Sequence, residues 1–187
     1  SEADARAFVE FDPEHTVIRP SGIYGPRNLE DISYWFITAF GSSVMGRFVV
    51  GDGRRLLQFV HVDDVVQGFR LALENPRSIG RTYHISDSRA YTYDEIYSTL
   101  AAIFGRRPPQ LHVPVPVAKA LVAPVEALNR LRGRDSFMFR ISTMDTFRED
   151  RNYSIERARK ELEYSPRWTL PVGLADTVRW YRENHYL

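Results

Sequence analysis

Two glycine-containing segments constrain this chain most: T-V-I-R-P-S-G-I-Y-G-P-R-N at residues 16–28, and G-D-G-R-R-L-L-Q-F-V-H-V-D-D-V-V-Q-G-F at residues 51–69. In the first segment, Val17 and Ile18 predict a short buried strand that breaks at Arg19-Pro20 into a turn. Proline fixes φ and lacks an N–H, while glycine lets a ligand approach the backbone closely. A strand that runs into such a loop indicates the carboxyl edge of an α/β sheet, where ligands bind.

Together the two segments resemble the C-terminal half of the extended short-chain dehydrogenases/reductases, the epimerase/dehydratase group. In that family the patterns run R-P-x-x-x-Y-G-P and G-D-G followed by F-V-H/Y-V-x-D. The resemblance covers nearly the whole chain. It implies an α/β fold: the C-terminal part of a Rossmann-like parallel sheet, with a small, mostly helical substrate-binding lid.

Two motifs of that family are absent from this sequence. No G-x-x-G-x-x-G lies between a strand and a helix, and Lys119 and Lys160, the only lysines, have no Tyr four residues earlier. We therefore interpret the chain as the C-terminal piece of a longer enzyme, with the N-terminal half as its missing partner and the catalytic residues upstream of Ser1. If Ser1 aligns with the Ser that precedes the family's catalytic lysine, Glu2 replaces that lysine. Otherwise the register differs and the pair lies upstream, or the parent is a degenerate member.

Composition excludes several classes of function. The chain has 187 residues, 43% hydrophobic residues and a net charge of +1, so no strong electrostatic field favours a nucleic-acid partner. It has no cysteine, and no two histidines lie four residues apart, so no metal site is expected. No apolar run reaches the roughly 18 residues of a membrane-spanning helix, and a cytoplasmic location is expected. The arginines around 106–107 and 130–134 are interpreted as solvated helix ends.

Hydrophobic periodicity predicts alternating strands and helices over residues 1–90, the Rossmann-like part, and mainly helices over 91–187, the lid. The strands are expected at 17–19, 48–50, 56–62 and 82–86, and the helices at 3–11, 30–46, 62–73, 92–103, 116–131, 154–162 and 170–181. Thr92 and Glu95 form a predicted capping box.

Three of the helices carry apolar stripes, which in globular proteins normally face the core. The stripes are Val62, Val65, Val66, Phe69 and Leu73; Val117, Leu121, Val125, Leu128 and Leu131; and Leu170, Leu174, Val178 and Tyr181.

The resemblance implies a cofactor, NAD or NADP, and the residues that meet it. Arg19, Pro20, Ser21 and Ile23 stand where the family's loop meets the nicotinamide end of the dinucleotide through backbone groups. The residue that separates NAD from NADP follows the second strand of the Rossmann domain, which lies outside this sequence.

Five residues are candidates for binding the substrate: Gly22, Tyr24, Arg27, Asn28 and Gln58. Tyr24 could instead pack in the core, and Arg27 could pair with a nearby acid such as Asp31.

His61, Asp63 and Asp64 look like a catalytic cluster, but a structural role is favoured. In the family, the aspartate at position 64 mainly fastens a helix to a loop.

Position 57 separates two branches of the family. Nucleotide-sugar members usually carry an arginine there, which contacts the diphosphate; this chain has Leu57, and only Arg54 or Arg55 could replace it in another register. The proline-flanked apolar helix after residue 111 is similar to that of the 3β-hydroxysteroid and sterol dehydrogenases.

We therefore expect the substrate-binding portion of an NAD(P)-dependent oxidoreductase, acting on a secondary alcohol or ketone of a sterol-like or similar small molecule. A homodimer is a further expectation. The alternatives are a portion of a nucleotide-sugar epimerase or dehydratase, and a non-catalytic relative used as a binding module. Since both catalytic motifs are absent, whether the chain belongs to an active enzyme stays open.

Overall fold

The computed structural model describes residues 14–29, 32–41, 45–133 and 140–187. The interpretation of 3–11 as a helix, and of Ser1 and Glu2, therefore lies outside the described residues. The strands are β1 (Val17–Pro20), β2 (Gly22–Tyr24), β3 (Phe48–Val50), β4 (Leu56–Leu57), β5 (Phe59–His61), β6 (Thr82–Ile85), β7 (Tyr91–Thr92) and β8 (Leu111–Val113). The helices are α2 (Ile32–Gly41), α3 (Val62–Glu74), α4 (Tyr93–Ile103), α5 (Val115–Leu131), α6 (Ile141–Asp145), α7 (Glu156–Leu162) and α8 (Leu170–Glu183), with the 3-10 turns η1 (Met45–Arg47), η2 (Pro76–Ser78) and η4 (Thr146–Arg148).

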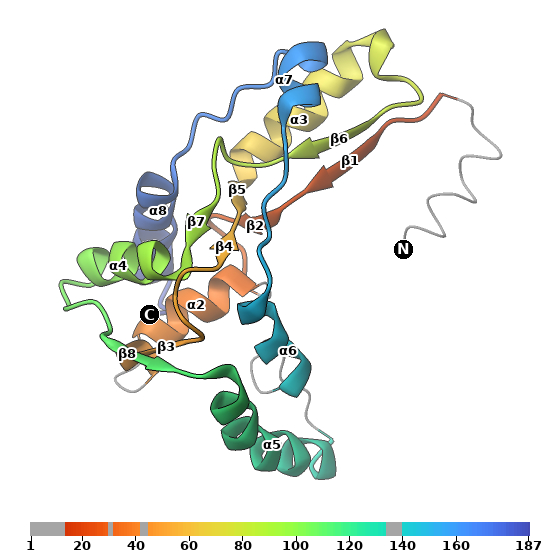
Figure 1. Ribbon diagram of the computed structural model, residues 1–187. Coiled ribbons are helices and arrows are strands. Elements are labelled where there is room, and N and C mark those ends of the chain that lie inside the picture. Colours follow the sequence, from red (N-terminus) through yellow and green to blue (C-terminus); the bar gives the residue numbers. More distant parts are fainter. Residues whose placement is uncertain (1–13, 30–31, 42–44, 134–139) are drawn as a thin grey trace.

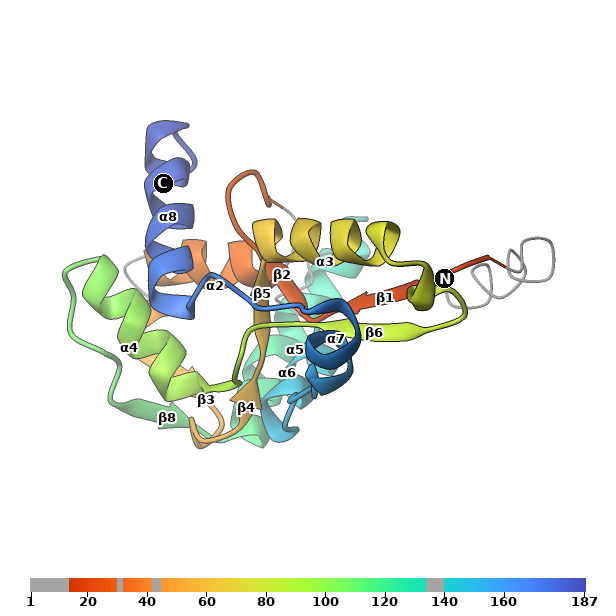
Figure 2. The same cartoon turned by 90° about the horizontal axis from the view of Figure 1, so that it is seen from above.

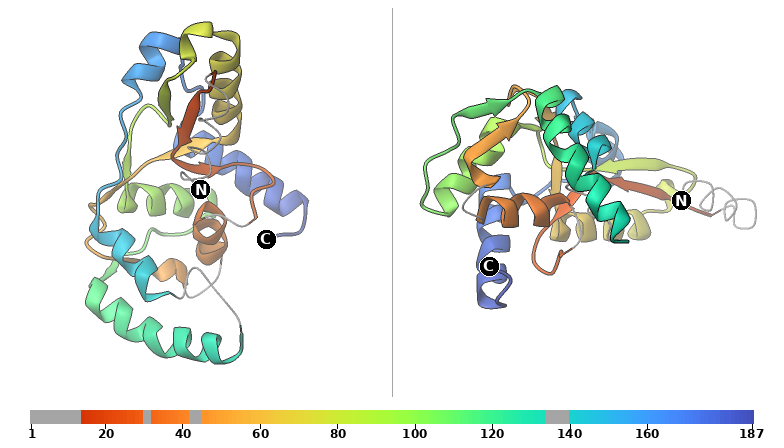
Figure 3. Two further views of the ribbon diagram at one scale, coloured as in Figure 1. Left: turned by 90° about the vertical axis from the view of Figure 1, so that its right-hand side faces the viewer. Right: turned by 90° about the horizontal axis from the view of Figure 1, so that it is seen from below.

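The strands pair two by two, and three of the four pairs are parallel: β1 with β6, β2 with β5, and β3 with β8, while β4 and β7 are antiparallel. In Figure 1 the β1–β6 pair forms an arm beside α3 and α7, whereas α2, α4 and α8 gather around the other strands. Helices α5 and α6 lie at the end opposite that arm, as the left view of Figure 3 also shows. Figure 2 shows α3 and α7 on either side of the β1–β6 pair. The α/β class predicted from the sequence is confirmed.

Two apolar cores hold these parts together. The larger core joins Tyr24 and Phe59 to Ile96 of α4 and Leu174 of α8, so it contains residues from both sides of position 90. The smaller one lies between the β1–β6 pair, α3 and α7, and includes Ile85 and Leu162. Because α7 returns to the β1–β6 arm, the division of the chain at residue 90 stays a prediction.

Several local predictions are confirmed. Thr92 accepts from the backbone N–H of Glu95 at 3.1 Å, while the Glu95 carboxylate accepts from the N–H of Thr92 at 2.8 Å, which completes the capping box. The stripe of α8, Leu170, Leu174, Val178 and Tyr181, is buried throughout. The single strand expected at residues 56–62 is instead two short strands, β4 and β5, with Gln58 between them. The Gln58 side chain bonds to the backbone of Asp87 and of Tyr153.

The stripe predicted for α5 is wrong. The small side of the helix, with Val115 and Ala118, packs on Met144 of α6 and Val50 of β3. The predicted stripe is exposed along the helix: Val117, Leu121, Val125, Leu128 and Leu131. None of the described helices is long and apolar enough to cross a membrane.

The stripe predicted for α3 is wrong as well. Val65 is buried, but Val66, Phe69 and Leu73 are exposed. The helix instead packs through Val65, Gly68 and Ala72, and the Ile85 side chain fills the space over Gly68. A Cβ atom at Gly68 would lie 2.9 Å from Cδ1 of Ile85, so only glycine lets α3 approach β6 this closely.

This contact makes Gly68 a sensitive position. Replacement by valine forces atoms into a buried space that Ile85 already fills, and overpacking of this kind costs about 2 kcal/mol. We expect Gly68→Val to lower the free energy of unfolding, measured by urea denaturation, by about that amount. Arg70→Val places the same residue on the exposed face of the same helix and should cost less than about 1 kcal/mol. Equal losses for the two variants would show that the Gly68 contact is not tight.

Candidate functional site

The first group of candidate residues lies where β1 ends. Arg19 and Pro20 are exposed there, at the carboxyl end of the strand. Ser21 donates its backbone N–H to the Ile85 carbonyl at 3.1 Å, and its hydroxyl lies 2.7 Å from that of Ser86. Arg19 and Pro20 are therefore accessible from solvent, while Ser21 ties the end of β1 to the end of β6.

Gly22 and Tyr24 face the core rather than solvent. A Cβ at Gly22 would lie 3.0 Å from Cδ1 of Phe59, so the missing side chain makes room for that ring. Tyr24 is fully buried, and its ring meets those of Phe59 and His61 edge to face, with centroids 5.9 and 5.4 Å apart. Burial raises the pKa of the Tyr24 hydroxyl well above its usual range. Tyr24 thus packs, the alternative left open by the sequence, and its direct contact with a substrate stays a prediction.

Gln58 is engaged entirely with backbone. It is 2% exposed; its Nε2 donates to the Asp87 carbonyl at 2.9 Å, and its Oε1 accepts from the N–H of Tyr153 at 2.6 Å. Both ends of the amide are therefore satisfied by the protein itself. The side chain fixes the segment around Tyr153 over the strands, and the substrate role expected for Gln58 stays untested.

Ile23, Arg27 and Asn28 line a pocket of about 810 Å³ between the loop after β2, the start of α3 and one side of α8. The other lining residues are Pro26, His61, Val62, Asp63, Asp176 and Trp180. Asn28 donates to the Ile23 carbonyl at 2.9 Å, and its own carbonyl accepts from the Tyr181 hydroxyl. The structure therefore divides the candidate residues: one group lies at the end of β1, and another lies around this pocket.

His61 forms the floor of that pocket and caps α3. Its Nδ1 accepts from the N–H of Asp63 at 3.3 Å, so the neutral ring carries its proton on Nε2, which lies 4.0 Å from Oδ2 of Asp176. The ring stacks on Trp168 with centroids 4.0 Å apart. Burial lowers the pKa of His61, and the carboxylates of Asp63 and Asp176 oppose that shift only in part.

Asp64 has the structural role that the sequence predicted. Its carboxylate is buried and accepts from the N–H of Arg167 at 2.9 Å and of Trp168 at 3.1 Å. These bonds fasten the start of α3 to the loop before α8 and hold Trp168 against His61. The sequence offered no sign of Trp168 itself, because a lone aromatic residue in a loop resembles any other.

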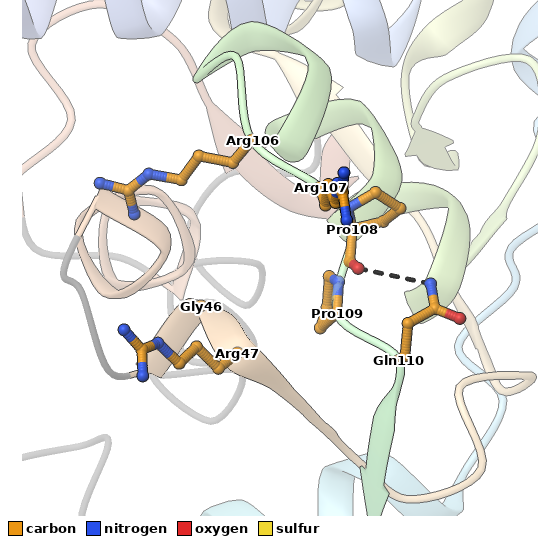
Figure 4. A pocket seen from close by; sticks show the side chains of 7 residues that line it. All are labelled: Gly46, Arg47, Arg106, Arg107, Pro108, Pro109 and Gln110. Atoms are coloured by element: carbon orange, nitrogen blue, oxygen red, sulfur yellow. Dashed lines mark hydrogen bonds between the residues drawn. The ribbon is translucent and has the colours of Figure 1, made fainter.

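A second hollow, of about 340 Å³, carries three arginines but does not form a comparable site (Figure 4). Arg106 donates to the carbonyls of Phe40 and Gly41 at 2.7 and 3.1 Å and so satisfies the end of α2. In Figure 4 the side chains of Arg47 and Arg106 extend to one side, and that of Arg107 stands apart from them. Among the described residues, no group of three His, Asp or Glu side chains could hold a metal ion.

Comparison with known proteins defines the class. Residues 6–86 match the model of the NAD dependent epimerase/dehydratase family. The chain is 30% identical over 175 residues to short-chain dehydrogenase/reductase family 42E member 1 of Bos taurus. The aligned region covers 88% of this chain and 43% of that relative. It is also 29% identical over 190 residues to the human protein "sterol-4-alpha-carboxylate 3-dehydrogenase, decarboxylating". That aligned region covers 91% of this chain and 48% of the relative.

A third relative, the dTDP-glucose 4,6-dehydratase of an Actinoplanes strain, is 32% identical over 173 residues, covering 90% of this chain and 44% of that protein. The fold matches the crystal structure of gox2253 with a TM-score of 0.71 at 23% identity, over 98% of this chain and 54% of that one. The chain thus belongs to the NAD-dependent epimerase/dehydratase family of extended short-chain dehydrogenases/reductases. It spans about half the length of the relatives it matches.

The Asp64 bonds predict a large effect on stability. In Asp64→Ala two partly buried N–H groups lose a charged acceptor, and we expect the free energy of unfolding to fall by about 3 kcal/mol. Asp63→Ala is the matched control: its side chain is exposed and interacts mainly with the start of the helix, which is worth at most about 1 kcal/mol. Chemical denaturation of both variants tests this, and a loss for Asp63→Ala as large as that for Asp64→Ala would contradict it.

His61 predicts a pH dependence. Because its pKa is lowered in the folded state, its contribution to stability is present above pH ~6.5 and is lost as the pH falls below that value toward the folded-state pKa. The free energy of unfolding should therefore fall as the pH is lowered from 7.5 to 5.5. His61→Asn keeps a capping side chain at the start of α3 and removes the titration, so the dependence should flatten between pH 7.5 and 5.5. If the free energy of unfolding depends on pH equally in wild type and in His61→Asn, the assignment of this dependence to His61 is refuted.

Proposed function

We propose that this chain is the substrate-binding portion of an NAD(P)-dependent oxidoreductase that acts on a secondary alcohol or ketone of a sterol-like small molecule. The observation that carries the proposal is Leu57. Its side chain is 4% exposed and lies in the larger core, at the position where nucleotide-sugar members carry an arginine. A buried leucine offers a diphosphate nothing to pair with, whereas an apolar substrate needs no cation there.

Of the two neighbouring arginines, Arg55 already has an acidic partner. Arg54 and Arg55 follow the Gly51–Gly53 turn; Arg55 lies 3.6 Å from the Asp150 carboxylate, and the N–H of Arg54 donates to Asp52 at 3.0 Å. The 29% identity to a sterol dehydrogenase supports the same branch.

The family binds NAD, and part of this chain fits the nicotinamide end of such a cofactor. Arg19 and Pro20 are exposed at the carboxyl end of β1, where the resemblance puts the nicotinamide, and the Ser21 hydroxyl lies 2.7 Å from that of Ser86, which supports a role of this segment in orienting the ring. A bound nicotinamide would supply the hydride acceptor or donor. The protein's own contribution here is orientation of the ring and substrate, while proton transfer is assigned to residues outside this sequence.

A second candidate function is nucleotide-sugar epimerisation or dehydration, and one observation favours it. Arg151 forms an isolated parallel bridge with Leu57, and its N–H donates to the Leu56 carbonyl at 2.8 Å. Arg151 is a half-buried residue on the segment next to position 57, and its guanidinium could supply the cation that Leu57 lacks. The 32% identity to a dTDP-glucose 4,6-dehydratase agrees with this alternative.

The two functions predict different turnover in the natural polypeptide that contains this sequence. With NAD⁺ or NADP⁺ and a 3β-hydroxysteroid, the proposal predicts substrate-dependent formation of NAD(P)H, followed by absorbance. Arg151→Gln should change the kcat/KM for the uncharged steroid less than about threefold, since the steroid carries no charge for Arg151 to pair with.

With dTDP-glucose or UDP-glucose as substrate, the alternative predicts conversion of the nucleotide sugar, and the rate of this conversion should fall at least about tenfold in Arg151→Gln. Turnover of the nucleotide sugar alone would overturn the proposal, and tight binding without turnover of either would identify a non-catalytic relative.

A further inference from the structure

The pocket of about 810 Å³ beside the start of α3 has a buried hydrogen-bond donor at its floor. The side chain of His61 is 1% exposed, and its Nε2 has no hydrogen-bond partner among the described residues. Because Nδ1 accepts from the N–H of Asp63, the neutral ring carries its proton on Nε2. An N–H group that is removed from water and left unpaired is destabilising, so Nε2 favours a bound molecule that can accept from it.

The Nε2 atom lies between the two walls of the pocket, and in Figure 2 the loop after β2 rises between the start of α3 and α8. On the side of that loop, a Cβ at Gly25 would lie 3.3 Å from Nε2, so glycine lets the backbone approach the ring closely. On the side of α8, Oδ2 of Asp176 lies 4.0 Å from Nε2. This distance is too long for a direct hydrogen bond, but an oxygen atom about 2.8 Å from both atoms would join them. That oxygen must accept from Nε2 and donate to the carboxylate, and a hydroxyl group does both.

The rest of the lining suits a neutral molecule larger than water. The volume of the pocket lies in the range of small-molecule sites, about 300–1,000 Å³. The carboxylate of Asp176 pairs with Arg179 of the same helix, while Asp63 and Arg27 are both exposed at the pocket and carry opposite charges. Since these charges balance, a neutral ligand is favoured, and the same groups can bond to several hydroxyl groups. Apolar surface is supplied by Ile23, Pro26, Val62 and Trp180.

Buried side chains separate this pocket from the place of the proposed reaction. Leu57 and Phe59 belong to the larger core, whereas Ile23, which lines the pocket, packs against the smaller core. Neither Leu57 nor the exposed pair Arg19 and Pro20 lines the pocket. A molecule bound here would therefore not contact the position that distinguishes the two branches of the family, nor the end of β1.

We propose that this pocket is a second ligand site, which binds a sugar-like cyclic polyol by placing one of its hydroxyl groups between Nε2 of His61 and the carboxylate of Asp176. A cyclic polyol carries hydroxyl groups around a ring whose faces are apolar, and so it matches both the polar and the apolar parts of the lining. Arg27, expected from the sequence to bind the substrate, then bonds to a hydroxyl group of this second ligand. The binding does not depend on the proposed reaction, because the ligand is held and not converted.

Titration of the full chain with methyl β-D-glucopyranoside, followed by tryptophan fluorescence, tests the proposal. Trp180 lines the pocket and Trp168 stacks on His61, so the emission of two of the three tryptophans should respond. For a ligand of this size we expect saturation with a Kd on the order of 1 mM.

Variants of α8 assign the binding to the pocket. Asp176→Ala should raise the Kd at least about tenfold, because the bound hydroxyl group loses a charged acceptor. Asp176→Asn keeps the size of the side chain and one acceptor oxygen, and it should bind more tightly than Asp176→Ala. Glu183→Ala is the matched control: Glu183 also lies near Arg179 but does not line the pocket, so the Kd should stay within about twofold of wild type.

Three results would overturn the proposal. One is the absence of a saturable change at about 50 mM glucoside, a concentration that would fill a site of the expected affinity and would leave water as the occupant. Another is an equal loss of affinity in Asp176→Ala and Glu183→Ala. The third comes from wild type alone: in nitrogen NMR spectra of the imidazole rings, the glucoside should shift the Nε2 resonance of His61 more than that of Nδ1, and an unchanged Nε2 resonance would place the ligand elsewhere. Circular dichroism verifies the fold of each variant.

Discussion

The carboxylate of Asp64 is the interaction on which the arrangement of the site depends. It accepts from two consecutive backbone N–H groups more than a hundred residues further along the chain, and so it joins the start of α3 to the loop before α8. A buried carboxylate is tolerated only when its oxygens are satisfied, and here two donors and the N-terminal end of α3 satisfy it. Once this link is made, Trp168 lies on His61, α8 lies beside Tyr24, and the two sides of the pocket are held at a fixed separation.

The candidate site therefore has a rigid part and an accessible part. His61, Tyr24 and Gln58 are buried and held by backbone or aromatic contacts, so they shape the strands' carboxyl ends rather than reach into solvent. Arg19, Pro20 and Arg27 are exposed on the loops that these residues support. This division lets exposed loops vary between relatives while the supporting contacts stay the same.

The sequence predicted much of the fold because its strongest signals are local. The capping box at Thr92 and the stripe of α8 each depend on neighbouring residues, and each is present in the structure. The turn expected after Arg19-Pro20 is instead short, because Gly22–Tyr24 form the strand β2. The errors share one physical cause. Helix α3 packs through Gly68 and Ala72, and α5 through Ala118, since small residues allow close approach. A periodicity argument weights residues by apolar size, and it therefore assigned the exposed face to the core. The engagement of Gln58 with Asp87 and Tyr153 could not be predicted either, because both partners are distant in sequence.

One edge of the fold has a consequence for how the sheet can grow. β1 pairs with β6 along one side, and no other described strand pairs with it. A further strand could join the other edge of β1 in either direction. A hairpin can supply only an antiparallel neighbour; a parallel neighbour connected to the same chain needs a crossover, which is almost always right-handed. A segment of the same chain that joins β1 in the parallel sense must therefore supply a strand together with its crossover segment, and the hand of that crossover decides which face of the sheet it covers.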